Sequence, residues 1–386
     1  MKILIISRGV PTQSDPVYGN FEAEQACALK HIGYDVKIIY VDRRSMVKFH
    51  RTRGINYISY KGIDAYGIFL FPLPVRIFPH LSILISCLLG KILYSKKIGD
   101  WKPDLIHSHY LFNLPIAVAI KKKYHIPIVA TEHWSALESM RKLRYVKVLS
   151  KYYKYSDSII SVSRHLASAI KRVSGAETTV IYNMVADDFF VPNVTDRKFP
   201  HARARVKFAS VGNLVKLKGY DVLISAFKKV QEDNVAIELD IIGDGPERDD
   251  LERMVASLDL GDNISFHGKK GKNEVISLLC QSDCFVLSSR SETFGVVYAE
   301  AMAVGIPVIA TDCGGPSEFV NANQGLLVPV GDVNALAEAM EKFARGEFKY
   351  SGNEIREYCR SLFSSASIAN QISNIYKSVI ANGIKY

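Results

Sequence analysis

The sequence lacks the motifs of two large classes of nucleotide-binding enzyme. Its first apolar run, Lys2–Ser7, is followed by Arg-Gly-Val-Pro-Thr-Gln, and Gly243-Asp244-Gly245 lacks the third glycine of a Gly-x-Gly-x-x-Gly turn. No Gly-x-x-x-x-Gly-Lys-Ser/Thr loop occurs. These turns supply the backbone N–H groups that hold a pyrophosphate or triphosphate. Their absence argues against NAD or FAD binding and against a P-loop NTPase.

Metal-binding and membrane-spanning patterns are also missing. The six cysteines form no Cys-x-x-Cys pair, which predicts reduced thiols and a cytoplasmic protein without a bound metal. No Asp-x-Asp pair is present to hold a divalent cation. The most lipid-like run, 77–90, is shorter than the about 20 residues that a spanning helix needs, and the N-terminus shows no secretory signal. We therefore expect a cytoplasmic protein.

Positive charge is concentrated in the first half of the chain. The net charge is +10, with +14 in residues 1–200 and −4 in the remainder. Such asymmetry predicts an anionic partner for the first half. No nucleic-acid-binding motif accompanies this charge, so we expect no nucleic acid as partner. We favour a phosphate group or the anionic inner face of the cell membrane as the partner. The clusters 48–53 and 121–123 and the apolar run 77–90 are the candidate contacts.

Short β-branched runs, among them 2–7 and 284–287, predict strands and alternate with predicted helices, among them 296–303 and 333–344, through both halves of the sequence. This alternation predicts an α/β protein with two doubly wound parallel sheets, each binding ligands at the carboxyl ends of its strands in a central cleft. We expect an N-terminal domain over residues 1–195 and a C-terminal domain over 206–364, joined by a polar linker near 192–205. An amphipathic helix over 365–386 is expected to pack back on the N-terminal domain.

Two stretches of the second half combine glycine with charge at predicted strand ends. Gly212-Asn213 follows a strand ending at Val211, and Lys218 stands directly before a predicted helix, where backbone N–H groups and a lysine can hold a phosphate. The run from Ser291 to Val308 carries Glu292 in a loop, Gly295 at a possible close backbone approach, and Glu300 eight residues after Glu292. Carboxylates accept hydrogen bonds from vicinal hydroxyls, so these two acids suit a nucleotide sugar.

This run resembles the donor signature of retaining glycosyltransferase family four, the group 1 type of GT-B fold. The likeness extends through 312–318 and 325–332, and upstream to 242–246 and 264–268. The resemblance implies that Lys218 binds the donor diphosphate, Glu300 the ribose, and Glu292 the sugar. The donor-binding residues it implies are Gly212, Asn213, Lys218, Phe266, Glu292, Phe294, Gly295, Val296 and Glu300.

The first half resembles the same family more loosely. Gly19 and Asn20 match its first loop, 103–109 matches a strand with a His-x-His element, and Thr131-Glu132-His133 matches a strand end with an acceptor-side histidine. The resemblance implies an acceptor side of Gly19, Asn20, His109 and His133, and a catalytic set of Glu292, His133 and Lys218. His133 could equally be a hydrogen-bonded structural residue. His107 and His109 share a strand face, but no third ligand is evident, so no metal is expected.

The sequence departs from the family pattern at three positions: Asn213 stands where arginine is common, Met184 where glycine follows asparagine, and Gly19 where two glycines are frequent. The resemblance implies transfer of a sugar, with retention, from a UDP- or GDP-sugar to a hydroxyl acceptor on a saccharide or lipid carrier, in bacterial surface polysaccharide or glycolipid assembly. Two alternatives are a soluble enzyme acting on a small phosphorylated acceptor and a sugar-nucleotide-binding protein without turnover. No cofactor is expected.

Overall fold

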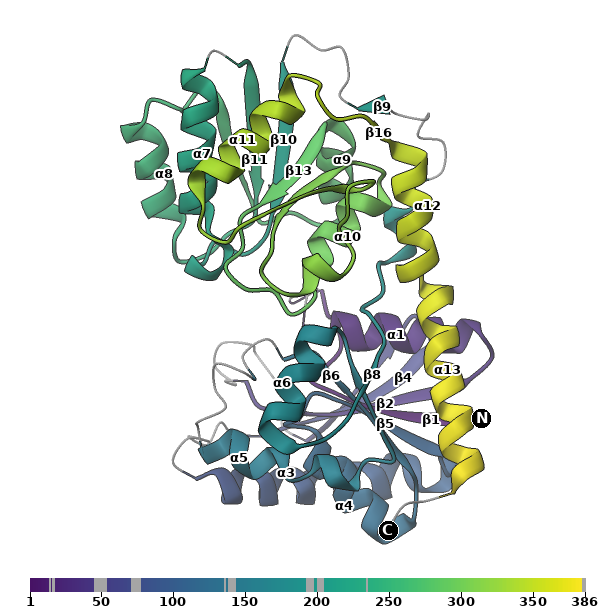
Figure 1. The fold of residues 1–386 in the computed structure, drawn as a ribbon. Coiled ribbons are helices and arrows are strands. Elements are labelled where there is room, and N and C mark those ends of the chain that lie inside the picture. The colour runs from purple at the N-terminus through teal and green to yellow at the C-terminus, as the bar shows by residue number, and fades with distance from the viewer. Residues whose placement is uncertain are drawn as a thin grey trace. The chain divides into compact units, whose positions relative to one another are not determined.

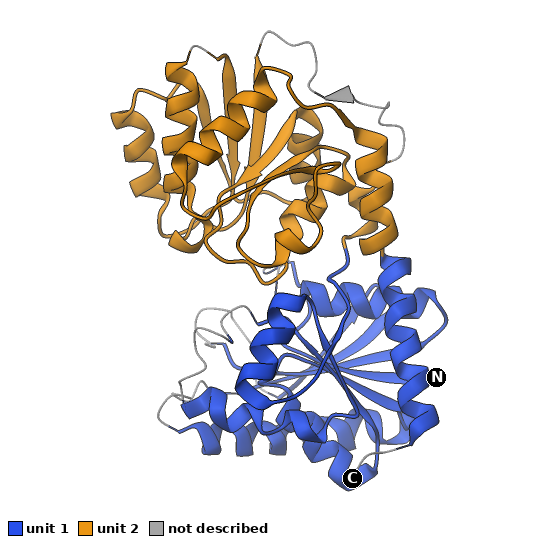
Figure 2. Ribbon diagram, in the orientation of Figure 1, with its two compact units in different colours: residues 1–184, 365–386 blue, residues 185–364 orange. Residues whose placement is uncertain are grey.

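The computed structural model describes residues 1–383 except 14, 16, 17, 45–53, 71–77, 135, 136, 138–143, 192–197, 200–204 and 234. The chain forms two compact units (Figures 1 and 2), one of residues 1–184 with 365–386 and the other of residues 185–364. Most of the expected linker, the basic cluster 48–53 and Ile77 lie outside the described residues.

Unit 1 is built on an eight-stranded sheet of order β3-β4-β2-β1-β5-β6-β7-β8. All neighbouring strands are parallel except the β3–β4 hairpin. The strands are β1 (Lys2–Ser7), β2 (Asp35–Asp42), β3 (Ile55–Tyr60), β4 (Ile63–Phe69), β5 (Leu105–His109), β6 (Ile128–Glu132), β7 (Ser158–Ser161) and β8 (Thr179–Val180). The central strands are buried on both faces, as parallel strands flanked by helices must be.

The helices of unit 1 cover both faces of its sheet (Figure 1). They are α1 (Asn20–His31), α3 (Pro79–Leu93), α4 (Leu114–Tyr124), α5 (Arg144–Ser150), α6 (Arg164–Ser174) and α13 (Ser365–Asn382). α3 contacts α4 and α5 on one side, and α13 contacts α1 on the other.

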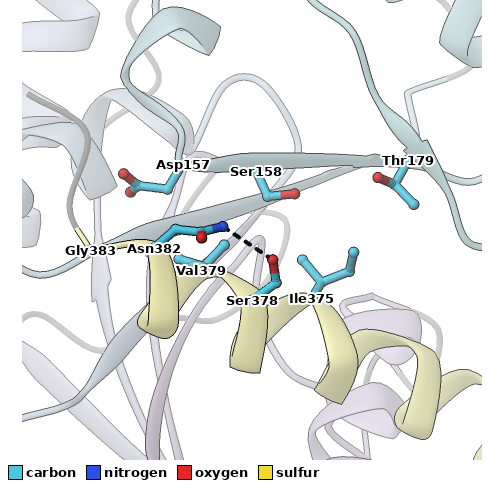
Figure 3. A pocket seen from close by; sticks show the side chains of 8 residues that line it. All are labelled: Asp157, Ser158, Thr179, Ile375, Ser378, Val379, Asn382 and Gly383. Carbon is cyan, nitrogen blue, oxygen red and sulfur yellow. Dashed lines mark hydrogen bonds between the residues drawn. The ribbon is translucent and has the colours of Figure 1, made fainter.

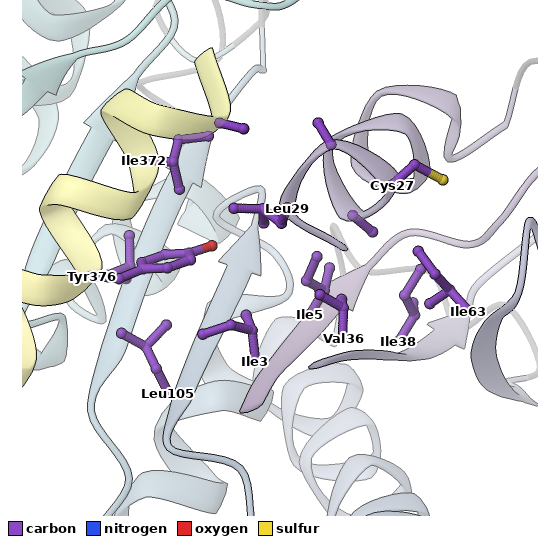
Figure 4. Close-up of a cluster of buried hydrophobic side chains, with 14 of the residues drawn as sticks. Ile3, Ile5, Cys27, Leu29, Val36, Ile38, Ile63, Leu105, Ile372 and Tyr376 are labelled. Atoms are coloured by element: carbon purple, nitrogen blue, oxygen red, sulfur yellow. The ribbon is translucent and has the colours of Figure 1, made fainter. Parts of the chain in front are cut away.

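The last helix of the chain is part of the core of unit 1. Ile372 and Tyr376 of α13 pack with Ile3 and Ile5 of β1 and with Leu29 of α1 (Figure 4), and all five are buried. Alternate residues of a strand point to the same face, so Ile3 and Ile5 face α13 together. Burial of large apolar side chains stabilises this docking by roughly 1.5–3 kcal/mol for each one.

Unit 2 contains a six-stranded parallel sheet of order β12-β11-β10-β13-β14-β15. Its strands are β10 (Val206–Val211), β11 (Ile237–Ile242), β12 (Ile264–Gly268), β13 (Cys284–Leu287), β14 (Val308–Thr311) and β15 (Gly325–Val328). Its helices are α7 (Tyr220–Glu232), α8 (Arg248–Ser257), α9 (Lys272–Gln281), α10 (Val296–Ala303), α11 (Val333–Ala344) and α12 (Gly352–Phe363). Two short strands, β9 (Lys198–Phe199) and β16 (Tyr350–Ser351), pair antiparallel beside it. β10 and β13 are neighbours, so the loops that follow them meet at one edge.

The boundary between the units falls after Met184, earlier than the expected end of the first domain at residue 195. Several interactions tie the next residues to unit 2. The Val185 N–H donates to the Phe363 carbonyl at 2.8 Å, and the Arg360 guanidinium lies 4.7 Å from the centre of the Phe190 ring. Asp188 forms an ion pair with Lys272. These long-range contacts connect segments that are far apart in the sequence.

Candidate active site

Lys218 is presented by a tight loop between β10 and α7. Lys216–Lys218 form a 3-10 turn, and Gly219 caps α7 with φ +67°. A Cβ atom at Gly219 would lie 2.2 Å from the Ser288 carbonyl oxygen, so only glycine fits both the backbone angle and the space. Lys218 therefore lies beside the amino end of α7, as predicted, and Lys216 in the same turn is exposed.

Lys218 and Glu292 are in direct contact across the β10 and β13 loops. Lys218 Nζ lies 2.5 Å from Glu292 Oε1, and Ser289 Oγ donates to the same oxygen at 2.7 Å. The two side chains are only 19% and 11% exposed, so solvent screens the pair weakly. The structure thus brings together two predicted site residues and adds Ser289, which the sequence did not single out.

The two loops are held together by a clamp that involves Arg290. Its backbone N–H donates to the Leu217 carbonyl at 2.8 Å, and its guanidinium forms a bidentate interaction with Asp221 at 3.0 and 2.7 Å. Ser288 Oγ donates to the Gly219 carbonyl at 2.6 Å. The hydrogen bonds from Arg290 lower the pKa of the Asp221 carboxyl group, which favours its charged form. The clamp fixes Lys218 and Glu292 relative to each other.

Gly295 begins α10 at the same edge of the sheet. Its φ is +84°, and a Cβ there would lie 2.8 Å from the Tyr298 ring. The Phe294 side chain is buried against Phe319 and Phe363, so only its backbone is left to line a site. The free N–H groups at the start of α10 provide a partial positive charge.

Glu300 lies one helical turn beyond this start, on α10. Burial raises the pKa of its carboxyl group to about 8, and the charge of Lys272 opposes this shift. Among the described residues none donates a hydrogen bond to the Glu300 carboxylate. A partly buried carboxylate without a donor is suited to receive hydroxyl groups of a ligand. Lys272, whose charge acts on Glu300, was not among the site residues predicted from the sequence.

The other predicted donor residues lie after β10 and on β12, two strands that β11 separates. Gly212 directly follows β10, and a Cβ there would lie 3.1 Å from Tyr220 Oη and 3.8 Å from the Lys218 side chain. Asn213 is exposed in the same loop, and Phe266 is partly buried on β12.

Three histidines of unit 1 stack at the carboxyl ends of β5 and β6. The ring centroids of His107 and His109 are 4.3 Å apart, and those of His109 and His133 are 5.3 Å apart. His109 Nδ1 lies 3.0 Å from His133 Nε2, and His133 Nδ1 lies 3.0 Å from Asn183 Oδ1. His107 contacts Tyr376 Oη of α13 at 2.5 Å and Thr131 Oγ1 at 2.6 Å. Both nitrogens of His107 and of His133 thus have protein partners.

Burial keeps these histidines neutral. It lowers the pKa of His107 to about 3 and that of His133 to about 4, and the pKa of His109 is also well below its usual value. Burial likewise raises the pKa of the Glu132 carboxyl group, whose oxygens accept from Tyr153 Oη and from the backbone of Leu111, His133 and Trp134. The buried His109 Nε2 has no hydrogen-bond partner among the described residues.

Gly19 and Asn20 form the start of α1 in the loop that follows β1. Gly19 has φ +77°, and a Cβ there would lie 2.2 Å from the Gly9 carbonyl oxygen. Phe21 of the same helix stacks on His133 with ring centroids 6.4 Å apart. The acceptor-side residues implied by the resemblance therefore lie near one another in unit 1.

In the described part of the chain, no group of three or more His, Cys, Asp or Glu side chains is arranged to hold a metal ion, and all six cysteines are free. A pocket lies where α13 passes the amino ends of β7 and β8 (Figure 3), lined by Ser158, Thr179 and Ser378 among others. Its acidic residue, Asp157, is paired with Lys121 at 2.6 Å. This pocket is at the end of the sheet opposite to the histidines.

Comparison with known proteins defines the class. The fold is similar to sucrose-phosphate synthase from Thermosynechococcus elongatus (TM-score 0.77, 21% identity, covering 99% of this chain and 100% of that one). It is also similar to Anabaena HepE in complex with UDP-glucose (TM-score 0.70, 19% identity, 98% and 100% covered). The expected fold class, two Rossmann-like parallel-sheet domains of GT-B type, is confirmed.

Sequence comparison narrows this to one family. Residues 194–361 match the model described as glycosyl transferases group 1, and residues 23–189 match the one described as Glycosyltransferase Family 4. An uncharacterized glycosyltransferase of Methanocaldococcus jannaschii is 32% identical over 80% of this chain and 83% of its own length. TuaC of Bacillus subtilis, named for teichuronic acid biosynthesis, is 27% identical over the whole of both chains. The chain belongs to glycosyltransferase family 4, and the predicted enzyme class is confirmed.

Proposed function

We propose that this glycosyltransferase moves a sugar from a nucleotide diphosphate sugar to a hydroxyl acceptor with retention of configuration. Unit 2 would bind the donor and unit 1 the acceptor. The observation that carries the donor assignment is the contact of Lys218 with Glu292 beside the start of α10. HepE, which shares the fold, is described in complex with UDP-glucose, and this supports a sugar nucleotide as ligand.

The departing diphosphate needs positive charge, and two sources are available. Lys218 supplies a formal charge, and the amino ends of α7 and α10 supply backbone N–H groups. When donor binds, its phosphate oxygens would compete with Glu292 Oε1 for Lys218 Nζ, which would release the Glu292 carboxylate toward the sugar hydroxyls. Because the sequence contains no Asp-x-Asp pair, we propose that the reaction proceeds without a divalent cation.

Two chemical routes lead to retention. In a double displacement, a carboxylate attacks the anomeric carbon, expels the diphosphate, and is then displaced by the acceptor. In the other, the acceptor oxygen attacks from the face of the leaving group, the bond to the diphosphate breaks, and a diphosphate oxygen takes the acceptor proton. We favour the second route, because the Glu292 carboxylate, once donor phosphates have taken Lys218, is better suited to bind sugar hydroxyls than to attack the anomeric carbon, and Ser289 still donates to its Oε1.

Product analysis tests this proposal. A thermal-shift screen of UDP- and GDP-sugars first identifies the donor, since a ligand that binds only the folded state raises the melting temperature. Proton NMR of the product, with and without excess EDTA, should then show the donor's anomeric configuration and unchanged activity. An inverted anomeric signal would refute retention. Activity lost to EDTA and restored by magnesium would refute the metal-free mechanism, and a trapped glycosyl–Glu292 adduct would support double displacement.

The setting we propose is bacterial surface polysaccharide or glycolipid assembly on a lipid carrier. The name of TuaC and the positive charge of residues 1–200 support it. The alternative, a small phosphorylated acceptor in solution, uses the same basic unit 1 without a membrane.

A surface feature of α3 favours the lipid carrier. Four apolar side chains, Phe78, Leu81, Leu84 and Leu88, are 51%, 45%, 66% and 54% exposed and lie three or four residues apart, along one face of the helix. Together we call them the α3 ridge. Lys91 continues this face, and α3, α4 and α5 contain no Asp or Glu. No described helix is long and apolar enough to cross a membrane. An apolar ridge that Lys91 continues fits the interface of an anionic bilayer, whereas Lys121 of α4 is buried and paired with Asp157 and does not contribute to it.

Vesicle binding tests the α3 ridge. The full chain should co-sediment with phosphatidylcholine vesicles that contain 30 mol% phosphatidylglycerol, and salt should weaken the binding. The double substitution Leu84→Glu/Leu88→Glu should reduce binding at least tenfold, whereas the control Leu327→Glu, at a leucine 39% exposed on β15, should leave it unchanged. Equal binding to neutral vesicles, or an undiminished signal from the double variant, would refute the proposal.

A further inference from the structure

Three arginines follow the central strands of unit 1, and they differ in their partners. Arg8, after β1, forms an ion pair with the buried Glu22 at 2.9 Å. Arg44, after β2, forms ion pairs with Asp15 and with Asp42, the latter at 3.0 Å. Arg43, between β2 and Arg44 in the chain, has no carboxylate of the described residues within ion-pair distance. Arg43 therefore differs from Arg8 and Arg44 in lacking a carboxylate partner among the described residues, and this difference requires an explanation.

The guanidinium of Arg43 is held only by neutral groups. Its Nη2 donates to the Phe112 carbonyl at 2.9 Å. Two further hydrogen bonds, from Nε to Ser86 Oγ and from Nη1 to Asn113 Oδ1, are each 3.4 Å long, at the long end of the hydrogen-bond range. Burial lowers the pKa of Arg43. A largely desolvated cation normally has an anionic partner, because its charge has lost the stabilisation of water.

The position of Arg43 suits an acceptor group. Arg43 follows β2 and Phe112 follows β5, so both lie at the carboxyl edge of the sheet, where His133 follows β6. The Arg43 guanidinium lies 5.4 Å from the centre of the Phe112 ring, and the residue is partly exposed, so an anion from solvent can reach it. Its planar fork of donors matches two oxygens of a phosphate.

We propose that Arg43 binds a phosphate or diphosphate group of the acceptor. Two of its three contacts are long enough to be exchanged for charge-assisted hydrogen bonds to phosphate oxygens, while the Phe112 carbonyl keeps the side chain in place. The inference rests on the proposed function in so far as it places the acceptor in unit 1. The ligand chemistry is shared by a lipid carrier phosphate and by a soluble sugar phosphate.

Binding of inorganic pyrophosphate, measured by calorimetry on the full chain, tests the site without requiring turnover. The Lys218→Ala variant is the starting protein, because it weakens the donor site, and it should still bind pyrophosphate. Adding Arg43→Gln should weaken this remaining affinity at least tenfold. Adding Arg43→Lys, which keeps the charge but loses the fork, should weaken it about three- to tenfold. The exposed Arg172→Gln in α6 is the matched control and should have no effect.

Competition identifies the source of the phosphate. Phosphatidylcholine vesicles with 5 mol% polyprenyl phosphate should displace pyrophosphate if the acceptor is lipid-linked, and glucose 1-phosphate should displace it if the acceptor is soluble. The proposal is overturned if the Lys218→Ala protein binds no pyrophosphate, or if neither competing ligand displaces pyrophosphate. It is also overturned if the Lys218→Ala/Arg43→Lys protein binds pyrophosphate as tightly as the Lys218→Ala protein. Circular dichroism checks that the double variant is folded. If the wild-type protein transfers no sugar, the proposed function is refuted, but the pyrophosphate-binding result still stands.

Discussion

The two units differ in the charge of the groups that lie at the carboxyl ends of their strands, although their sheets are similar. In unit 2, the loops after β10 and β13 carry charged pairs, with Lys218 on Glu292 and Arg290 on Asp221. In unit 1, the ends of β5 and β6 carry three stacked histidines that burial keeps neutral. Both are parallel sheets with helices on two faces, so the difference comes from the loop sequences and not from the topology.

This difference shows how the same edge can serve two kinds of ligand. A charged pair on short, clamped loops can exchange its internal partner for a phosphate without leaving a buried charge unpaired. A neutral stack of rings gives a weakly charged surface that can bind a sugar, while Arg43 at the end of β2 would supply the positive charge for a phosphate of the acceptor. We therefore predict effects for each unit that differ in magnitude and in the direction of their pH dependence.

The largest effect is expected at Lys218. Lys218→Ala should lower turnover by roughly 10²–10³-fold, the scale of losing one preorganised charge-stabilising group. The measurement is the steady-state rate with the donor found by thermal shift. Lys216→Ala, in the same turn but exposed, is the matched control and should stay within a few-fold of wild type. If the two variants have similar rates, Lys218 has no special role at the diphosphate.

A smaller effect is expected from Glu300 and concerns stability. Its pKa is raised to about 8 in the folded protein from 4.5, so the folded state holds a proton that the unfolded chain releases between these pH values. The stability contributed by this group is fully present below pH 4.5 and is lost as pH rises toward 8, by at most about 1.4 kcal/mol per pH unit. Melting temperatures measured from pH 5 to 8.5 should fall less steeply for Glu300→Gln than for wild type. Parallel curves would show that the Glu300 carboxyl group is ionised throughout.

Much of the fold could be predicted from the sequence where strands and helices are regular. The predicted strands at 2–7 and 284–287 and the helices at 296–303 and 333–344 match the observed bounds, because β-branched runs and apolar periodicity are clear there. The β3–β4 hairpin was not predicted. Its turn uses Lys61 and Gly62, both with positive φ, and the glycine was the available signal.

The candidate site was predicted as separate residues but not as an arrangement. Lys218 and Glu292 are 74 positions apart, and their contact depends on β10 lying next to β13, which strand patterns alone do not specify. The Arg290–Asp221 clamp, and the lack of a carboxylate partner for Arg43 among the described residues, were missed for the same reason, because the partners of a charged loop residue depend on the three-dimensional fold. The His-x-His element was noticed, whereas the hydrogen bond between His107 and Tyr376 could not be foreseen, because the two residues are 269 positions apart.

The smallest effect is expected from the histidines, with the opposite sign to Glu300. Burial lowers the pKa of His133 to about 4, so the unfolded chain binds protons near pH 6.5 that the folded protein does not. Their stability contribution is present above pH 6.5 and is lost as pH falls toward 4. His133→Gln removes one such group, so the loss of stability from pH 6.5 to pH 4, measured as the fall in melting temperature, should become less steep, by at most about 1.4 kcal/mol per pH unit, while the pH dependence above 6.5 is unchanged. An unaltered acid slope would show that His133 titrates normally and is exposed in solution, and it would remove the contrast between the neutral histidines of unit 1 and the charged pairs of unit 2.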